Sequence, residues 1–229
     1  MPLAGTASVA MLQITLVGEG WPLRRLRPMR AGPLAVAISW AVALVVYVTL
    51  VGVVPPAGSG LTARHGPVPG AELGAVLVLV GAWQVLCYVT WRGWPFSTIA
   101  NRATRLITAH VVVLGGGILS YAVAHAVLGI DAVRTAAVAG CFIAAGLLFG
   151  MLLEGWLGDL PAPVERAVLL LATLPLTAVL AVALDAAAGT VHFSRVTADD
   201  WVEHALSTAI ILHVAVGRRW PFRQRQPAY

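Results

Sequence analysis

The chain has 229 residues, of which 59% are hydrophobic and only 11% are charged, and its mean hydropathy is +0.85. An average soluble domain carries roughly 25% charged residues, so this composition excludes a soluble globular protein and predicts one embedded in a membrane. All 15 basic residues are arginine, which excludes Schiff-base chemistry on a lysine amine. The net charge of +5 does not indicate nucleic acid as a partner, because arginine placement in a membrane protein sets its orientation.

Long uncharged runs define the fold class. A hydrocarbon core of ~30 Å requires a helix of about 20 apolar residues, and several runs reach that length. None alternates polar and apolar residues as a barrel strand does. We therefore predict an all-α, polytopic integral membrane bundle in the cell inner membrane. It divides into an N-terminal segment (1–31), the transmembrane bundle (32–217) and a cytoplasmic basic tail (218–229).

The N-terminal segment begins with residues 3–18, which are moderately apolar but include Gln13. No basic stretch precedes them, so we do not expect a cleaved signal peptide. One interpretation is a helix of ~24 Å that lies in the interface or packs against the bundle. The other is a seventh transmembrane span.

Six longer runs follow in chain order. Proline and glycine mark their ends, and Pro175 is expected to kink the fifth run. The predicted spans are 33–54, 71–91, 106–129, a fourth that ends near Glu154, a fifth that begins at Pro161 and Pro163, and 201–217.

A tryptophan motif marks the end of every second run. The sequence RGWPF at 92–96 returns as RRWPF at 218–222, with weaker copies at 19–23 and 154–157. The motifs recur at intervals of roughly 60 to 75 residues, which indicates a repeated two-helix hairpin. The predicted architecture is therefore three tandem hairpins with six spans, or seven if residues 3–18 also cross.

The distribution of the arginines predicts which ends of these hairpins face the cytoplasm. Twelve lie on the side of the tryptophan motifs, and only Arg64, Arg134 and Arg195 lie on the other side. Cytoplasmic loops carry the excess of arginine, so the motifs and the C-terminus are predicted to be cytoplasmic. Indole rings settle at headgroup level, and the predicted anchors in the lipid bilayer are Trp21, Trp94, Trp156 and Trp220.

Acidic and histidine side chains form a candidate metal site at the opposite face. Asp200 and His204 are four residues apart on the expected helix, and Glu203 lies beside them, so these side chains share a helix end. With His125, they are candidate ligands for a divalent metal. The alternative is ordinary capping of a helix N-terminus by acidic residues.

A second histidine pair suggests a cofactor. His110 and His213 each lie five residues inside an arginine, at a similar depth below the cytoplasmic boundary. Paired imidazoles of this kind could hold haem or a metal. Two haem tiers are not expected, because the histidine spacings on the two helices differ. The alternative for each histidine is a hydrogen bond to a neighbouring helix.

A few polar or flexible residues inside the runs are candidates for a transport pathway. They are Gln84 in the second span, Asp185 near the outer end of the fifth, and Gly116 at the centre of a glycine triplet. A helix weakened by glycine is a feature of transporter substrate sites. Gly146 and Gly150 instead have the spacing of close helix packing.

Three functions follow from these features. The first is a small transporter or channel-like protein for an ion or small solute. The second is a membrane-embedded metal- or haem-binding redox or oxidase subunit. The third is a non-catalytic scaffold that assembles with other membrane subunits or with copies of itself. The sequence contains no Walker, CxxC, HExxH, GxSxG or dinucleotide motif, so it assigns no enzymatic activity.

Overall fold

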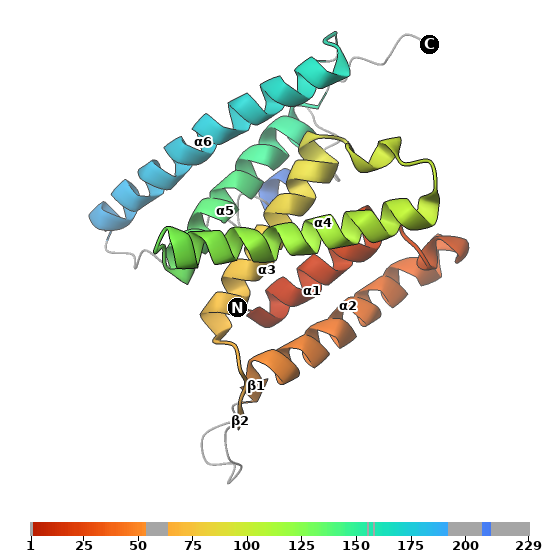
Figure 1. Cartoon of the computed structure of the whole chain (residues 1–229), viewed down its shortest axis with the longest axis horizontal. Helices are drawn as coiled ribbons and strands as arrows, with labels where there is room; N and C mark the ends of the chain where they lie inside the picture. The colour runs from red at the N-terminus through yellow and green to blue at the C-terminus, as the bar shows by residue number, and fades with distance from the viewer. Residues whose placement is uncertain (1, 54–63, 155, 158, 192–207, 212–229) are drawn as a thin grey trace. The chain divides into compact units, whose positions relative to one another are not determined.

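The computed structural model is all-α apart from one short strand pair, and it describes residues 2–53, 64–154, 156–157, 159–191 and 208–211 (Figure 1). Five of its helices are long and apolar enough to cross a membrane, so the prediction of a multi-pass helical protein is confirmed. They cover Met29–Leu50, Gly70–Thr90, Arg102–Val127, Ala132–Leu152 and Ala162–Ala187. The predicted sixth span lies outside the described residues except for a helical turn at 208–211.

The α-helices are α1 (Pro2–Leu12), α2 (Pro28–Leu50), α3 (Gly70–Gln84), α4 (Arg102–Ala122), α5 (Ala132–Leu147) and α6 (Ala162–Val191). Four of them continue as a π-helical segment: η1 (Gln13–Val17) after α1, η3 (Val85–Thr90) after α3, η5 (Val123–Val127) after α4 and η6 (Leu148–Leu152) after α5. The strands β1 (Gly52–Val53) and β2 (Arg64–His65) pair antiparallel after α2.

Helix ends differ from the predicted spans for local reasons. α4 begins at Arg102 rather than at residue 106, because the Asn101 side chain accepts a hydrogen bond from the backbone N–H of Thr104 and caps the helix. α6 includes Pro163 in its first turn, as predicted, where the missing N–H of proline removes no helical bond. Pro175 lies within α6, which continues beyond it to Val191.

The chain divides into two compact units. Unit 1 contains residues 1–84 and 99–136, and unit 2 contains residues 85–98 and 137–229. The divisions fall where α3 becomes η3 and within the first turns of α5. Each unit is described by itself below.

Unit 1 is a group of four helices. α1 packs against both α2 and α3, and α3 packs against α4; α1 and α2 lie side by side in Figure 1. The interior face of α1 buries Thr6 and Ala7, and η1 buries Gln13 and Val17. Residues 2–17 therefore form a helix that packs against α2 and α3. Such packing is common to both predicted forms of the N-terminal segment, which stay predictions. Its apolar part, Leu3–Val17, is shorter than the five long helices.

Glycines in α4 let two helices approach closely. A Cβ at Gly116 would lie 2.5 Å from Cε2 of Trp83, and a Cβ at Gly117 would lie 2.8 Å from the backbone nitrogen of Val80. α4 is helical throughout this triplet. At Gly116 and Gly117 the absent side chain therefore makes room for α3 rather than interrupting α4.

Unit 2 uses glycine in the same way. A Cβ at Gly146 would lie 2.6 Å from a methyl of Val85, and a Cβ at Gly150 would lie 2.6 Å from a methyl of Val89. The predicted packing role of this glycine pair is confirmed. An apolar cluster of Val85, Leu147 and Ile210 lies beside it.

Two tryptophan motifs have the same backbone form. Glu19 and Gly20 both have positive φ, as do Arg92 and Gly93, and in each motif the following Trp-Pro peptide is cis. A short 3-10 turn comes next, at Leu23–Arg25 and at Phe96–Thr98. Each motif thus ends one helix and sets up the start of the next.

Candidate functional site

A buried polar contact in unit 1 joins two glutamine side chains. Gln84 at the end of α3 is fully buried, and Gln13 at the start of η1 is 9% exposed. Nε2 of Gln84 donates to Oε1 of Gln13 over 3.1 Å and to the carbonyl oxygen of Val9 over 3.2 Å. The pair thereby links α3 to the N-terminal helix across a sequence separation of 71 residues.

Each glutamine of this pair has one polar atom without a hydrogen-bond partner among the described residues. Oε1 of Gln84 and Nε2 of Gln13 are buried without a hydrogen bond among the described residues. An unsatisfied buried polar group costs about 1–3 kcal/mol. The two atoms together offer one acceptor and one donor, and neither carries a charge. The pair therefore leaves one acceptor atom and one donor atom open inside unit 1.

A second polar contact lies one residue away along the chain. Nε1 of Trp83 donates to Oγ of Ser120 over 3.1 Å, and the Trp83 ring lies against Gly116. Of the predicted pathway residues, Gln84 therefore belongs to the buried amide pair, whereas Gly116 contacts an indole. Asp185 is exposed on α6 of unit 2.

An ionic cluster fixes the first tryptophan motif in unit 1. Oε1 of Glu19 accepts from Nε of Arg105 over 2.7 Å, and Oε2 accepts from Nε of Arg102 over 3.1 Å. The Arg105 hydrogen bond, with a further contribution from Arg102, lowers the pKa of Glu19 below its ordinary value of 4.5, although partial burial opposes this. The motif is thereby tied to the first turn of α4.

Unit 2 contains an ionic cluster of reversed sign. Arg92, which stands two residues before Trp94 as Glu19 stands before Trp21, donates to Oε1 of Glu154 and to Oε1 of Glu165, both over 3.0 Å. Glu165 lies in the first turn of α6. In each unit the residue two positions before the tryptophan therefore contacts the first turn of a later helix.

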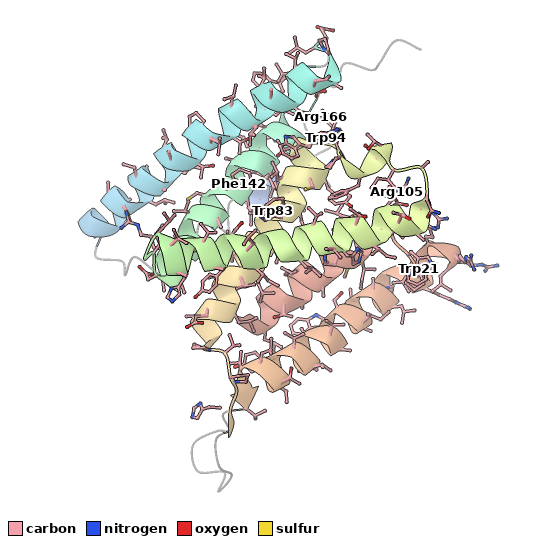
Figure 2. All side chains as sticks on the ribbon, viewed as in Figure 1. Trp21, Trp83, Trp94, Arg105, Phe142 and Arg166 are labelled. Atoms are coloured by element: carbon pink, nitrogen blue, oxygen red, sulfur yellow. The ribbon has the colours of Figure 1, made fainter. Side chains whose placement is uncertain are left out.

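Three of the predicted anchor tryptophans, Trp21, Trp94 and Trp156, are described, and all three are partly exposed. Trp21 is 55% exposed, and Trp94 and Trp156 also rank among the exposed large apolar residues. The guanidinium of Arg166 lies 5.5 Å from the Trp94 ring, a cation–π contact visible in Figure 2. Trp220 lies outside the described residues.

The predicted metal and haem ligands are only partly described. Asp200, Glu203, His204 and His213 lie outside the described residues. Nδ1 of His110 is 3.0 Å from the carbonyl oxygen of Leu106 in its own helix.

His125 stacks on Tyr121, with ring centroids 5.6 Å apart. In the part of the chain that the structure describes, no group of three or more His, Cys, Asp and Glu side chains could hold a metal ion. The two histidine hypotheses therefore stay predictions.

Sequence reasoning missed two of these features. Gln13 was noted only as a polar residue in the N-terminal run, yet an amide alone in an apolar helix signals a partner on another helix. The ionic clusters were also missed, although the position two residues before each tryptophan alternates between Glu19, Arg92, Glu154 and Arg218. That alternation is a signal of complementary pairing.

Comparison of the chain with known protein families, with curated proteins and with solved structures finds no match.

Proposed function

We propose that this chain is a small membrane transporter or channel-like protein, and that its substrate is a small uncharged polar solute. The observation that carries the proposal is the buried pair of Gln13 and Gln84, with one open donor and one open acceptor. Polar groups within a membrane bundle are costly and commonly mark substrate pathways.

The chemistry of the pair favours a neutral solute over an ion. Both side chains are amides, which are uncharged at every physiological pH. A cation in an apolar bundle requires either a negative charge or several oxygen ligands, and the pair offers one open oxygen. Urea, a simple amide or a polyol instead presents a donor and an acceptor side by side and matches the two open atoms.

The purified full-length chain in liposomes tests this proposal. Light scattering after an osmotic step measures the entry of urea or glycerol, and a potassium-sensitive dye measures ion flux. We expect solute entry above that of protein-free liposomes and no ion flux. Replacing Gln84 with Leu removes the oxygen that would accept a hydrogen bond from the solute. The loss of that bond costs ~1 kcal/mol, which corresponds to about a fivefold loss of solute occupancy.

Ser39→Ala is the matched control. Ser39 is also buried in unit 1, but its short hydrogen bond, of 2.6 Å, is to the carbonyl of Ala35 in its own helix, and its contact with Sδ of Met11 is longer, at 3.8 Å. We expect this variant to retain wild-type solute entry. If Gln84→Leu and Gln13→Leu both fold and transport normally, the pair serves only to join helices and the proposed solute site is wrong. Wild-type protein that admits no more solute than protein-free liposomes would instead make a scaffold the better assignment.

We also propose the finer topology of the chain. Three hairpins, six spans or seven, and cytoplasmic tryptophan motifs are supported by the positive φ angles that Glu19 and Gly20 share with Arg92 and Gly93 and by the arginine distribution. In a variant without Cys87 and Cys141, single cysteines at Ser97 and Ala132 should react with a membrane-impermeant maleimide from opposite sides of sealed vesicles. Reaction from the same side would overturn this topology.

A further inference from the structure

The arginine segment, residues 21–30, joins η1 to α2 and includes the first residues of α2, and it concentrates positive charge that no described residue of unit 1 neutralises. Its four arginines occur within seven residues, all are exposed, and no carboxylate of the described chain lies within ion-pair distance of them. They are Arg24, Arg25, Arg27 and Arg30.

Four other arginines of the described chain already have partners. Arg102 and Arg105 share Glu19, which is the acidic residue nearest to the arginine segment in sequence. In unit 2, Arg92 contacts two carboxylates, and Arg166 lies against Trp94. The arginine segment is therefore the largest uncompensated cationic feature of the described chain.

The start of α2 adds a second positive feature to this segment. Arg27 occupies the N-cap position without a side-chain cap, and the first turn contains no acidic residue. By contrast, Asn101 caps α4, and Oδ1 of Asp131 accepts from the backbone N–H of Arg134 at the start of α5. A helix N-terminus carries about half a positive charge. At α2 this charge adds to those of the arginines, so an anion would offset both.

Apolar side chains alternate with these arginines and face outward. Trp21 is 55% exposed, Leu26 is 40% exposed and Met29 is 90% exposed. Side chains of this kind enter the boundary between headgroups and acyl chains. The anion that fits the segment therefore carries acyl chains of its own.

We propose that the segment 21–30 is a binding site for an anionic phospholipid. The phosphate is held by arginine guanidinium groups at the N-terminus of α2, and the acyl chains lie against Trp21, Leu26 and Met29. The site is independent of the proposed solute pathway, because it shares no residue with the pair of Gln13 and Gln84.

Native mass spectrometry of the full chain tests this site. The protein is mixed in detergent with equal amounts of phosphatidylglycerol and phosphatidylcholine, and the retained lipids are counted. Each arginine near an anionic surface contributes about 1 kcal/mol, so we expect at least about tenfold enrichment of phosphatidylglycerol. Replacing all four arginines with Gln should abolish the enrichment, whereas Arg134→Gln should leave it unchanged.

The single variant Arg27→Asp tests whether the phosphate lies at the N-terminus of α2. It places a carboxylate at the N-cap of α2, where the carboxylate would occupy the position of the phosphate, so it should reduce lipid retention more than Arg27→Gln does.

Helix content by circular dichroism identifies any variant that fails to fold. The variant with all four arginines replaced by Lys keeps the charge and should retain the preference for phosphatidylglycerol. Unselective lipid retention by wild type, or enrichment that persists in the fourfold Gln variant, would overturn the proposal. Displacement of the lipid by millimolar inorganic phosphate would indicate a free-anion site and would also overturn it.

Discussion

The ionic cluster at Glu19 gives the most direct test of the structure. Replacing Glu19 with Gln keeps the shape of the side chain but removes the charge that pairs with Arg102 and Arg105. The side chains of Glu19 and Arg102 are each 32% exposed, and that of Arg105 is 25% exposed, so solvent screens both interactions. Exposed ion pairs contribute about 0.2–1 kcal/mol each, and hydrogen bonds to charged groups contribute somewhat more. We therefore expect Glu19→Gln to lower the free energy of unfolding by ~1–2 kcal/mol.

The pH dependence of this loss has a definite sign. Because the Arg105 hydrogen bond lowers the pKa of Glu19 in the folded state, its contribution is fully present above the ordinary pKa of 4.5. The contribution disappears as the pH falls through the lower pKa of the folded protein. The stabilities of wild type and Glu19→Gln should therefore differ at pH 7 and converge in acid.

Reversible unfolding by SDS in mixed micelles provides the measurement. A double-mutant cycle of Glu19→Gln and Arg105→Gln isolates the pairwise term, which we expect to be about 1 kcal/mol. The reversed polarity of Arg92 and Glu165 in unit 2 suggests a second variant, Glu19→Arg with Arg105→Glu. This exchange should recover part of the lost stability, although Arg102 then faces a like charge. A coupling energy indistinguishable from zero would show that Glu19 and Arg105 do not stabilise the fold as a pair.

Two further predictions concern packing and the second ionic cluster. Gly116→Ala places a methyl 2.5 Å from the Trp83 ring, so we expect a loss of about 1–3 kcal/mol by SDS unfolding and a smaller loss when Trp83 is also replaced with Leu. Arg92→Gln leaves Glu154 and Glu165 without their shared cation, so the same assay should show a loss of ~1 kcal/mol that high salt diminishes. Salt-independent losses for Arg92→Gln would contradict the assigned ion pairs.

Two groups of glycines show which helix contacts a local sequence pattern predicts and which it does not. The spacing of Gly146 and Gly150 correctly indicated close helix packing, because a four-residue interval places both on one helix face. The triplet around Gly116 was interpreted as a weak point of its helix, yet α4 is continuous there. The difference lies in Trp83, whose ring fills the space above Gly116 and comes from another helix.

The formation of long apolar helices that can span a membrane follows from the composition of each segment. Length and the absence of charge are properties of each segment alone, and a lipid environment requires every such segment to satisfy its own backbone hydrogen bonds. The pairing of Gln13 with Gln84 and of Glu19 with Arg105 depends instead on the packing of helices in three dimensions. These partners lie 71 and 86 residues apart, so their contact depends on which helices pack together, and no local pattern of apolar residues specifies that choice.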